Sequence, residues 1–237
     1  MRTLVLWDID HTLLAVGPLT RTIYESAFTT VTGRTLAAHG VPSFAGRTDR
    51  AIITETLLMH GIETSEPLLQ RLCHEFATGF GARIQEIREH GRVLPGAREA
   101  LKALANRTDV VQSVLTGNMR PIAISKLAAF SLDEYVDFEV GAYGLDHGER
   151  APLVRLAQLR AAEKYGEPFD EHSTVLVGDT PHDVRAGHHG GARVVAVATG
   201  ASDEATLRQV GAELVLPDLS DTPTVITSIL GTASEPS

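Results

Sequence analysis

The sequence predicts an α/β fold, in which the strands of a parallel sheet alternate along the chain with helices. Short apolar runs that end in polar residues indicate the strands, and stretches with helical periodicity lie between those runs. A third observation is that about eighty residues after the first run carry helical patterns and no run typical of a buried strand. This stretch predicts a helical insert in the α/β core.

The predicted strands are continuous apolar runs, as expected for strands that are buried on both faces. They cover residues 3–7, 110–115, 174–177 and 193–198, and a shorter run at 213–216 predicts an edge strand. Helical patterns lie between them at 96–105, directly after Pro95, and at 152–164. Because parallel neighbours need a crossover, which is usually a helix, this alternation favours a parallel sheet.

The expected insert covers residues 16–92. Apolar residues recur there at helical spacing in three stretches, at 19–31, 52–58 and 68–80. Turn-forming residues stand at both junctions, Gly17 and Pro18 at the start and the stretch 91–96 at the end. The predicted organisation is therefore a core of residues 1–15 and 93–230, an insert of residues 16–92 and a tail of residues 231–237.

The composition is that of a globular protein and excludes several classes of function. The 237 residues are 43% hydrophobic and 22% charged, and the net charge of −9 disfavours binding to a nucleic acid. The single cysteine, Cys73, excludes an intrachain disulfide. Asp8 interrupts the first apolar run too early for a signal peptide, and no run approaches the roughly 18 residues of a membrane span. We therefore expect a soluble, cytoplasmic protein with no nucleic-acid or membrane partner; the sequence leaves its oligomeric state unknown.

Polar residues follow the predicted strands at the edge where ligands of open parallel sheets bind. Asp8 and Asp10 follow the first strand, and Asp179 follows the third of the four main strands. The remaining candidates at this edge are Thr116, Gly117, Asn118, Arg150 and Asp183. The sequence thus predicts that carboxylates and a cation converge on one rim.

These residue types suit a metal and a phosphoryl group. Clustered carboxylates repel one another unless a divalent cation lies among them, and oxygen ligands suit Mg²⁺. The Thr116 hydroxyl, the amides near Gly117 and Asn118, and the Arg150 guanidinium are donors for phosphoryl oxygens. Two aspartates two residues apart add a nucleophile and a proton carrier, so the pattern indicates nucleophilic phosphoryl transfer.

The order of these residues resembles the four motifs of the haloacid dehalogenase superfamily. The matching stretches are Asp8 to Thr12, Thr116 to Asn118, Arg150, and Asp179 to Asp183. The resemblance covers nearly the whole chain, because the family carries a helical cap where the insert falls. It implies a Rossmann-like parallel sheet with helices on both faces and an inserted α-helical cap domain.

The resemblance also implies an activity and roles for the motif residues. The protein would be a Mg²⁺-dependent phosphatase that hydrolyses a small phosphorylated metabolite, phosphoglycolate-like or a sugar phosphate, through an aspartyl-phosphate. Asp8 would be the nucleophile, and Asp10 would protonate the leaving group and then activate water. The Asp8 side chain, the Asp10 carbonyl and Asp179 would hold Mg²⁺.

The other candidates would support this chemistry. Thr116, Gly117 and Asn118 would bind the phosphoryl group, and Arg150 would replace the usual lysine of the third motif. Asp183, four residues beyond Asp179, would face the same side on a continuous helical turn and orient a metal-bound water or a metal ligand. The segment at 46–49 resembles the caps of phosphoglycolate-phosphatase-like members, so Arg47 is a candidate for contact with a substrate carboxylate.

Alternatives remain within and outside this activity. A dehalogenase of the same fold needs neither Mg²⁺ nor a second motif aspartate, so Asp10 and Asp179 argue against it. A phosphomutase would pass the phosphoryl group to a sugar, and a non-catalytic binding module would not need the intact aspartates. Outside these motifs, His188 and His189 are expected at a helix C-terminus and not at a metal, and Cys73 is expected in the core.

Overall fold

The computed structural model describes residues 2–36 and 40–231, and within them the main sheet has five strands in the order β4-β1-β5-β6-β7, all parallel. The strands are β1 (Thr3–Trp7), β4 (Val110–Val114), β5 (Thr174–Gly178), β6 (Arg193–Val197) and β7 (Leu214–Leu216). Each predicted strand is confirmed to within one residue at either end. The tail prediction for 232–237 lies outside the described residues.

Helices cover both faces of this sheet. Leu4 and Leu6 of β1 pack on the face covered by α7 (Ala151–Tyr165) and α8 (Pro181–Gly190). Val5 and Trp7 point to the opposite face, where α5 (Ala97–Ala105) and α10 (Thr222–Leu230) pack. The helix α9 (Glu204–Gln209) lies against β7. Because alternate residues of a strand face opposite ways, burial on both faces explains the continuous apolar runs of the sequence.

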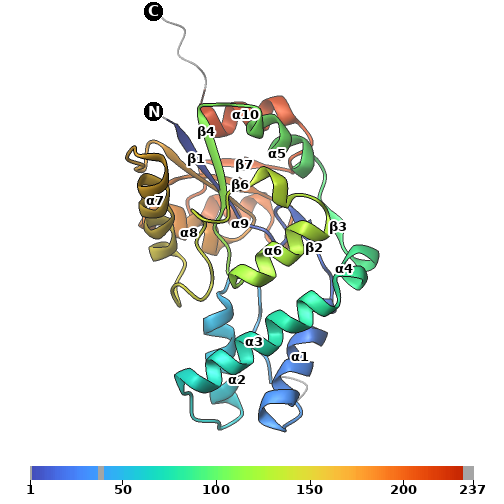
Figure 1. The fold of residues 1–237 in the computed structure, drawn as a ribbon. Helices are drawn as coiled ribbons and strands as arrows, with labels where there is room; N and C mark the ends of the chain where they lie inside the picture. Colours follow the sequence, from blue (N-terminus) through green and yellow to red (C-terminus); the bar gives the residue numbers. More distant parts are fainter. Residues whose placement is uncertain (1, 37–39, 232–237) are drawn as a thin grey trace, which may run out of the picture.

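The stretch after β1 is helical, as predicted. It contains α1 (Leu19–Thr32), α2 (Asp49–Met59), α3 (Glu66–Ala82) and α4 (Ile84–His90). Figure 1 shows α1, α2 and α3 below the sheet, with α4 beside α6 (Arg120–Ala129). The ring of Phe76 packs edge to face on Tyr24 and Phe80, with centroids 5.2 and 5.3 Å apart. Leu58 belongs to the apolar pattern at 52–58, but it is 63% exposed and does not lie in the core.

Two short strands, which the sequence pattern does not reveal, connect this helical stretch to the rest of the chain. The strand β2 (Leu14–Ala15) pairs antiparallel with β3 (Arg92–Val93). A strand of two residues is too short to produce a periodic pattern. The outgoing and returning chain segments therefore run side by side next to the end of β1.

Helix α6 (Arg120–Ala129), followed by a 3-10 turn at Asp133–Tyr135, joins the sheet to the helical stretch. It begins directly after the candidate residues 116–118 and packs against α3 and α4. Its buried side chains include Ile122, Ala123, Lys126 and Leu127, which form one stripe along the helix. The lysine in this stripe is the only charged member of the set.

The predicted positions of His188 and His189 at a helix C-terminus, and of Cys73 in the core, are confirmed. His188 and His189 lie in the last turn of α8, which ends at Gly191 with φ 78°. Glycine favours this left-handed conformation, so the stretch is a helix C-cap. Cys73 is buried in the core, and burial raises the pKa of its thiol to about 12. None of the helices in the described residues is long and apolar enough to cross a membrane.

Candidate active site

The sheet register brings the predicted motif residues to one edge. Trp7, at the end of β1, pairs with Val114 of β4 on one side and Val177 of β5 on the other. The next residue, Asp8, therefore lies between the ends of the two neighbouring strands. Thr116 and Asp179 follow those strands, so all three leave the sheet at the same rim.

A tight turn directly after Asp8 shapes the rim. The Ile9 carbonyl accepts hydrogen bonds from the backbone amides of Thr12, Leu13 and Leu14, at 3.3, 3.0 and 3.1 Å. His11 has a φ of 62° in this turn, a left-handed conformation that costs energy for a residue with a side chain. The turn places the Thr12 hydroxyl 3.3 Å from Oδ1 of Asp179, to which it donates.

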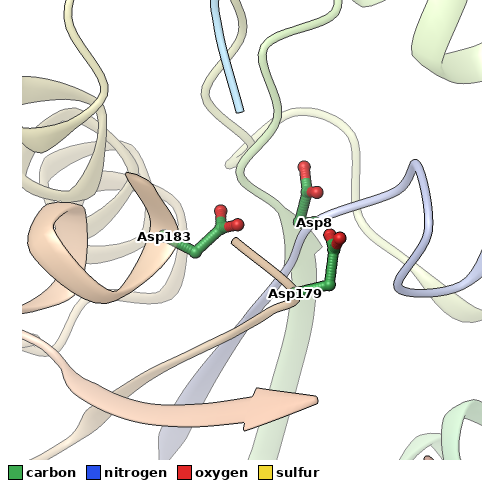
Figure 2. Close-up of side chains that lie close together, drawn as sticks. All are labelled: Asp8, Asp179 and Asp183. Atoms are coloured by element: carbon green, nitrogen blue, oxygen red, sulfur yellow. The ribbon is translucent and has the colours of Figure 1, made fainter. Parts of the chain in front are cut away.

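Three buried carboxylates converge beyond β1 and β5. Asp8, Asp179 and Asp183 are at most 5% exposed and offer oxygens that all lie within 4.8 Å of one another. Figure 2 shows the three side chains gathered at the rim, Asp183 from α8 and the others from the strand ends. Burial and mutual repulsion raise the pKa of Asp8 and of Asp179, although Arg150 opposes both shifts. Without a further cation, the cluster is electrostatically unfavourable.

Asp183 reaches this cluster by a route that differs from the predicted one. The helix α8 begins at Pro181, so Asp179 precedes the helix and the two aspartates do not share a helical turn. Asp183 instead folds back to cap the helix, and its Oδ2 accepts hydrogen bonds from the Thr180 amide and hydroxyl. Its Oδ1 pairs with Arg150. Both oxygens of Asp183 are therefore engaged, which suits a supporting position.

Arg150 joins the carboxylates, as its position before α7 predicted. It is the N-cap residue of α7 and is 7% exposed. Its Nη2 lies 3.1 Å from Oδ1 of Asp8 and also bonds Asp183 and the Leu115 carbonyl. Burial alone would lower the pKa of Arg150, but the two aspartates raise it above its ordinary value. The guanidinium therefore stays charged beside Asp8.

The loop after β4 places hydrogen-bond donors at the same rim as the carboxylates. Thr116 is fully buried, and its hydroxyl oxygen accepts hydrogen bonds from the Asn118 amide and side chain, at 3.2 and 2.8 Å. The Thr116 hydroxyl hydrogen is thus available to a ligand. A Cβ at Gly117 would lie 1.9 Å from the Arg47 carbonyl oxygen, so only glycine allows this close approach.

Asp10 has a buried cationic partner that the motif analysis missed. Lys126, which is 1% exposed, places its Nζ 2.7 Å from both carboxylate oxygens of Asp10. Asn118 donates to Oδ2 of Asp10 at 2.7 Å. Burial would raise the pKa of Asp10, but Lys126 and Asn118 outweigh it and lower that pKa. A lysine within the apolar stripe of α6 is the sequence signal that could have revealed this contact.

Asp49 is a further buried acid, to which the sequence pattern assigned no role of its own. It is the first residue of α2 and is 5% exposed. Its Oδ2 accepts a hydrogen bond of 2.7 Å from the Met119 amide. Burial is the main cause that raises the pKa of Asp49 to about 7, although Met119 and Lys126 oppose the shift.

A cavity of about 590 Å³ opens over this rim. Every predicted site residue except Asp183 lines it, and residues of the helical stretch form the opposite wall. Arg47 belongs to that wall and pairs with Glu55 of α2. Arg185 of α8 also lines the cavity. His182 lines it as well, outside the carboxylate cluster.

The carboxylate cluster fits a hard divalent cation. Asp8 and Asp179 offer oxygens at the rim, and among the described residues no backbone or side-chain hydrogen bond is given to the Asp10 carbonyl. Oxygen ligands from two carboxylates and one carbonyl leave room for waters and a phosphoryl oxygen, as Mg²⁺ requires. The repulsion that raises the pKa of Asp8 and Asp179 is what such an ion would relieve.

Comparison with known proteins identifies the family. The family model of haloacid dehalogenase-like hydrolases matches residues 5–188, and the chain belongs to this family. A phosphoglycolate phosphatase of Nitrosospira multiformis is 23% identical over 224 residues, 94% of each chain. The pyrophosphatase PpaX of Halalkalibacterium halodurans is 26% identical over 228 residues, 92% of this chain and 94% of its own.

The fold is shared with solved structures. A hydrolase from Pseudomonas syringae superposes with a TM-score of 0.69 at 23% identity, covering 96% of this chain and 99% of its own. The predicted α/β class with a parallel sheet, and the predicted membership of the superfamily, are both confirmed. The roles of the individual site residues stay predictions.

Proposed function

We propose that this protein is a Mg²⁺-dependent phosphatase that hydrolyses a small phosphorylated metabolite through an aspartyl-phosphate intermediate. The observation that carries the proposal is the convergence of Asp8, Asp179, Arg150 and Thr116 on one cavity. Two relatives with phosphatase and pyrophosphatase names support it, because they match over nearly the whole chain.

In the first step, an oxygen of Asp8 attacks phosphorus and the bond to the ester oxygen breaks. Lys126 and Asn118 favour the ionised form of Asp10, so Asp10 would first take up a proton from water; it then gives this proton to the departing oxygen, and an alcohol leaves. In the second step, water attacks the aspartyl-phosphate and its proton passes to Asp10. The bond between phosphorus and Asp8 then breaks, and inorganic phosphate is released.

The remaining residues of the rim would bind the phosphoryl group. The Thr116 hydroxyl and the amide of Gly117 would donate to its oxygens, and Arg150 would offset the charge of Asp8 as that residue attacks. The Asn118 amide and side chain already donate to Thr116 and Asp10, so Asn118 would act by holding these two residues in place. A Mg²⁺ ion held by Asp8, the Asp10 carbonyl and Asp179 would neutralise phosphoryl charge.

The cavity wall favours a substrate with a second acidic group. Arg47 and Arg185 line the cavity and are not members of the carboxylate cluster, and both are cations. Phosphoglycolate and pyrophosphate, named by the two relatives, each carry such a group beside the phosphoryl group. We favour this class over sugar phosphates, whose hydroxyl groups need no cation.

We also propose that residues 16–92 form a cap on a core of residues 1–15 and 93–230. The paired strands β2 and β3 carry both connections next to Asp8, and residues of the helical stretch wall the cavity. Closure of this cap would exclude bulk water from the phosphoryl group. The cytoplasmic location stays a prediction.

The test is an assay with p-nitrophenyl phosphate, phosphoglycolate and pyrophosphate, in EDTA and after addition of Mg²⁺. We expect EDTA to abolish phosphate release and Mg²⁺ to restore it, with Asp8→Asn retaining less than about 1 part in 10⁴ of the activity. Beryllium fluoride should form its adduct on Asp8. Full activity in EDTA, or near-normal kcat of Asp8→Asn, contradicts the proposal. With a sugar phosphate as the substrate, transfer of the phosphoryl group to a sugar without release of free phosphate would favour the phosphomutase alternative.

A further inference from the structure

Two buried cations of the candidate site pair with different aspartates. Arg150 pairs with Asp8 and Asp183, and Lys126 pairs with Asp10. The third motif accounts for Arg150, but no motif includes Lys126. Burial of an ammonium costs several kcal/mol unless it is fully paired, so packing alone does not explain a lysine in the apolar stripe of α6.

The contacts of Lys126 use all its donors. The Nζ lies 2.7 Å from each carboxylate oxygen of Asp10 and 2.8 Å from Oδ1 of Asn118. An ammonium has three N–H groups, and these three acceptors match them. The Phe80 ring of α3 lies 5.4 Å from the same nitrogen. Lys126 therefore contacts residues that follow the strands β1 and β4, and also a residue of the helical stretch.

Lys126 also fixes the neighbouring amide. Because Oδ1 of Asn118 accepts from Lys126, the Nδ2 group faces the other way. There it donates to Oδ2 of Asp10 at 2.7 Å and to the Thr116 hydroxyl oxygen at 2.8 Å. One lysine thereby orients a carboxylate, an amide and a hydroxyl that all line the cavity.

We propose that Lys126 is a positioning residue that holds the Asp10 carboxylate at the leaving group of the substrate. This inference rests on the proposed phosphatase function, in which Asp10 gives a proton to the departing oxygen and later takes one from water. The Asp10 side chain remains 37% exposed while both its oxygens are held by Lys126 and Asn118, so the network fixes its direction without covering it. Proton transfer depends steeply on such alignment.

The inference predicts a dependence on the leaving group. Phenyl phosphate and p-nitrophenyl phosphate have nearly the same shape, but phenolate is the more basic leaving group and needs the proton more. Lys126→Met, which keeps the length of the side chain, should lower kcat for phenyl phosphate about 10- to 100-fold more than for p-nitrophenyl phosphate. KM should change little for either ester. The ratio of the two kcat values does not depend on how much of the variant is folded.

Two further variants test the route through Asp10. Asp10→Asn combined with Lys126→Met should lose much less activity than the product of the two single losses, since Lys126 acts mainly through the residue already removed. In Lys126→Ala, ethylammonium should restore part of the phenyl phosphate activity, because Lys126 lines the cavity. Lys102→Met, at an exposed position on α5, is the matched control and should leave both esters unaffected.

The outcomes separate this inference from the proposed function. If the wild-type protein hydrolyses neither ester with Mg²⁺, the phosphatase proposal has failed and the inference fails with it. If the wild type hydrolyses both, equal losses for the two esters in Lys126→Met contradict the positioning role. Multiplicative losses in the double variant contradict it as well.

Discussion

Oδ2 of Asp49 accepts a hydrogen bond of 2.7 Å from the backbone nitrogen of Met119, across the cavity wall from α2 to the loop after β4. The Asp49 amide in turn donates to the Gly117 carbonyl at 2.7 Å. The adjacent Thr48 hydroxyl donates to the Gly148 carbonyl at 2.9 Å. The start of α2 is thus bound directly to the loop that presents Thr116, so a shift of this helix would disturb the candidate phosphate site.

Asp49 should make the stability of the protein depend on pH. Burial raises its pKa from 3.8 to about 7, so the folded state binds its proton more tightly than the unfolded state. Ionisation of Asp49 therefore lowers the free energy of unfolding. This destabilisation is absent below about pH 4, grows as the pH rises, and is complete above about pH 7. We expect Asp49→Asn, which can still accept from Met119, to be more stable relative to wild type at pH 8 than at pH 5, by roughly 1–4 kcal/mol.

Urea unfolding of the wild type and of Asp49→Asn, each at pH 5 and pH 8, measures this difference in stability. Asp203→Asn is the control, because hydrogen bonds from Thr206 lower the pKa of this exposed N-cap residue of α9. Its folded and unfolded pKa values both lie below pH 5, so its effect on stability should be the same at both pH values. An equal effect of Asp49→Asn at the two pH values would show that Asp49 is not the source of the penalty.

Gly117→Ala should damage the candidate phosphate site through a clash with the helical stretch. The new Cβ would lie 1.9 Å from the Arg47 carbonyl oxygen, a backbone atom that cannot turn aside. We expect a loss of about 1–3 kcal/mol in stability and at least about a tenfold loss in kcat/KM. Gly81→Ala on α3, where nothing lies within 4 Å, is the control and should be neutral or slightly stabilising. Wild-type stability and activity of Gly117→Ala would contradict the close packing of the two segments.

Much of the site could be predicted because strand ends locate it. A run buried on both faces is visible in the sequence, and the polar residues that follow it lie at one rim by the geometry of a parallel sheet. Asp8, Thr116 and Asp179 needed only this rule, and Arg150 was located by its position at the start of the helix that precedes β5. Their placement on one cavity agrees with that prediction, while their roles await experiment.

Lys126 and Asp49 could not be located in the same way. Each lies on a helix, and its contact with the site depends on how that helix packs, which no strand end specifies. The packing of α6 against α3 and α4 decides that Lys126 meets Asp10 and not solvent. Asp183 lies beside Asp8 and Asp179, but not through the shared helical turn that its spacing predicted. The helix α8 begins two residues after Asp179, and a capping interaction draws the Asp183 side chain back.

Mg²⁺ should stabilise the folded protein, and more strongly at pH 8 than at pH 5.5. Burial and mutual repulsion raise the pKa of Asp8 and Asp179, so protons compete with the ion at the lower pH. At one hundred times its dissociation constant, the ion should add about 2.7 kcal/mol. Thermal unfolding with EDTA and with Mg²⁺ measures the effect. Asp179→Asn should lose most of it, and an unchanged response of this variant would place the ion elsewhere.

The last prediction concerns Arg47, which we expect to select substrates and not to bind the phosphoryl group. Arg47 lines the cavity from the segment before α2 and pairs with Glu55, whereas Thr116 and Arg150 lie at the rim beside Asp8. Every substrate shares the phosphoryl group, so Thr116→Ala and Arg150→Ala should depress kcat/KM for all esters alike. Arg47→Ala should cost about 10-fold or more for phosphoglycolate or pyrophosphate and much less for p-nitrophenyl phosphate, which has no second acidic group. The measurement is kcat/KM of the three variants on the three substrates, with Glu55→Gln as a fourth variant that frees Arg47 without removing its charge. An equal loss of kcat/KM on all three substrates in Arg47→Ala would mean that the arginine supports the fold of the cavity wall and does not distinguish substrates.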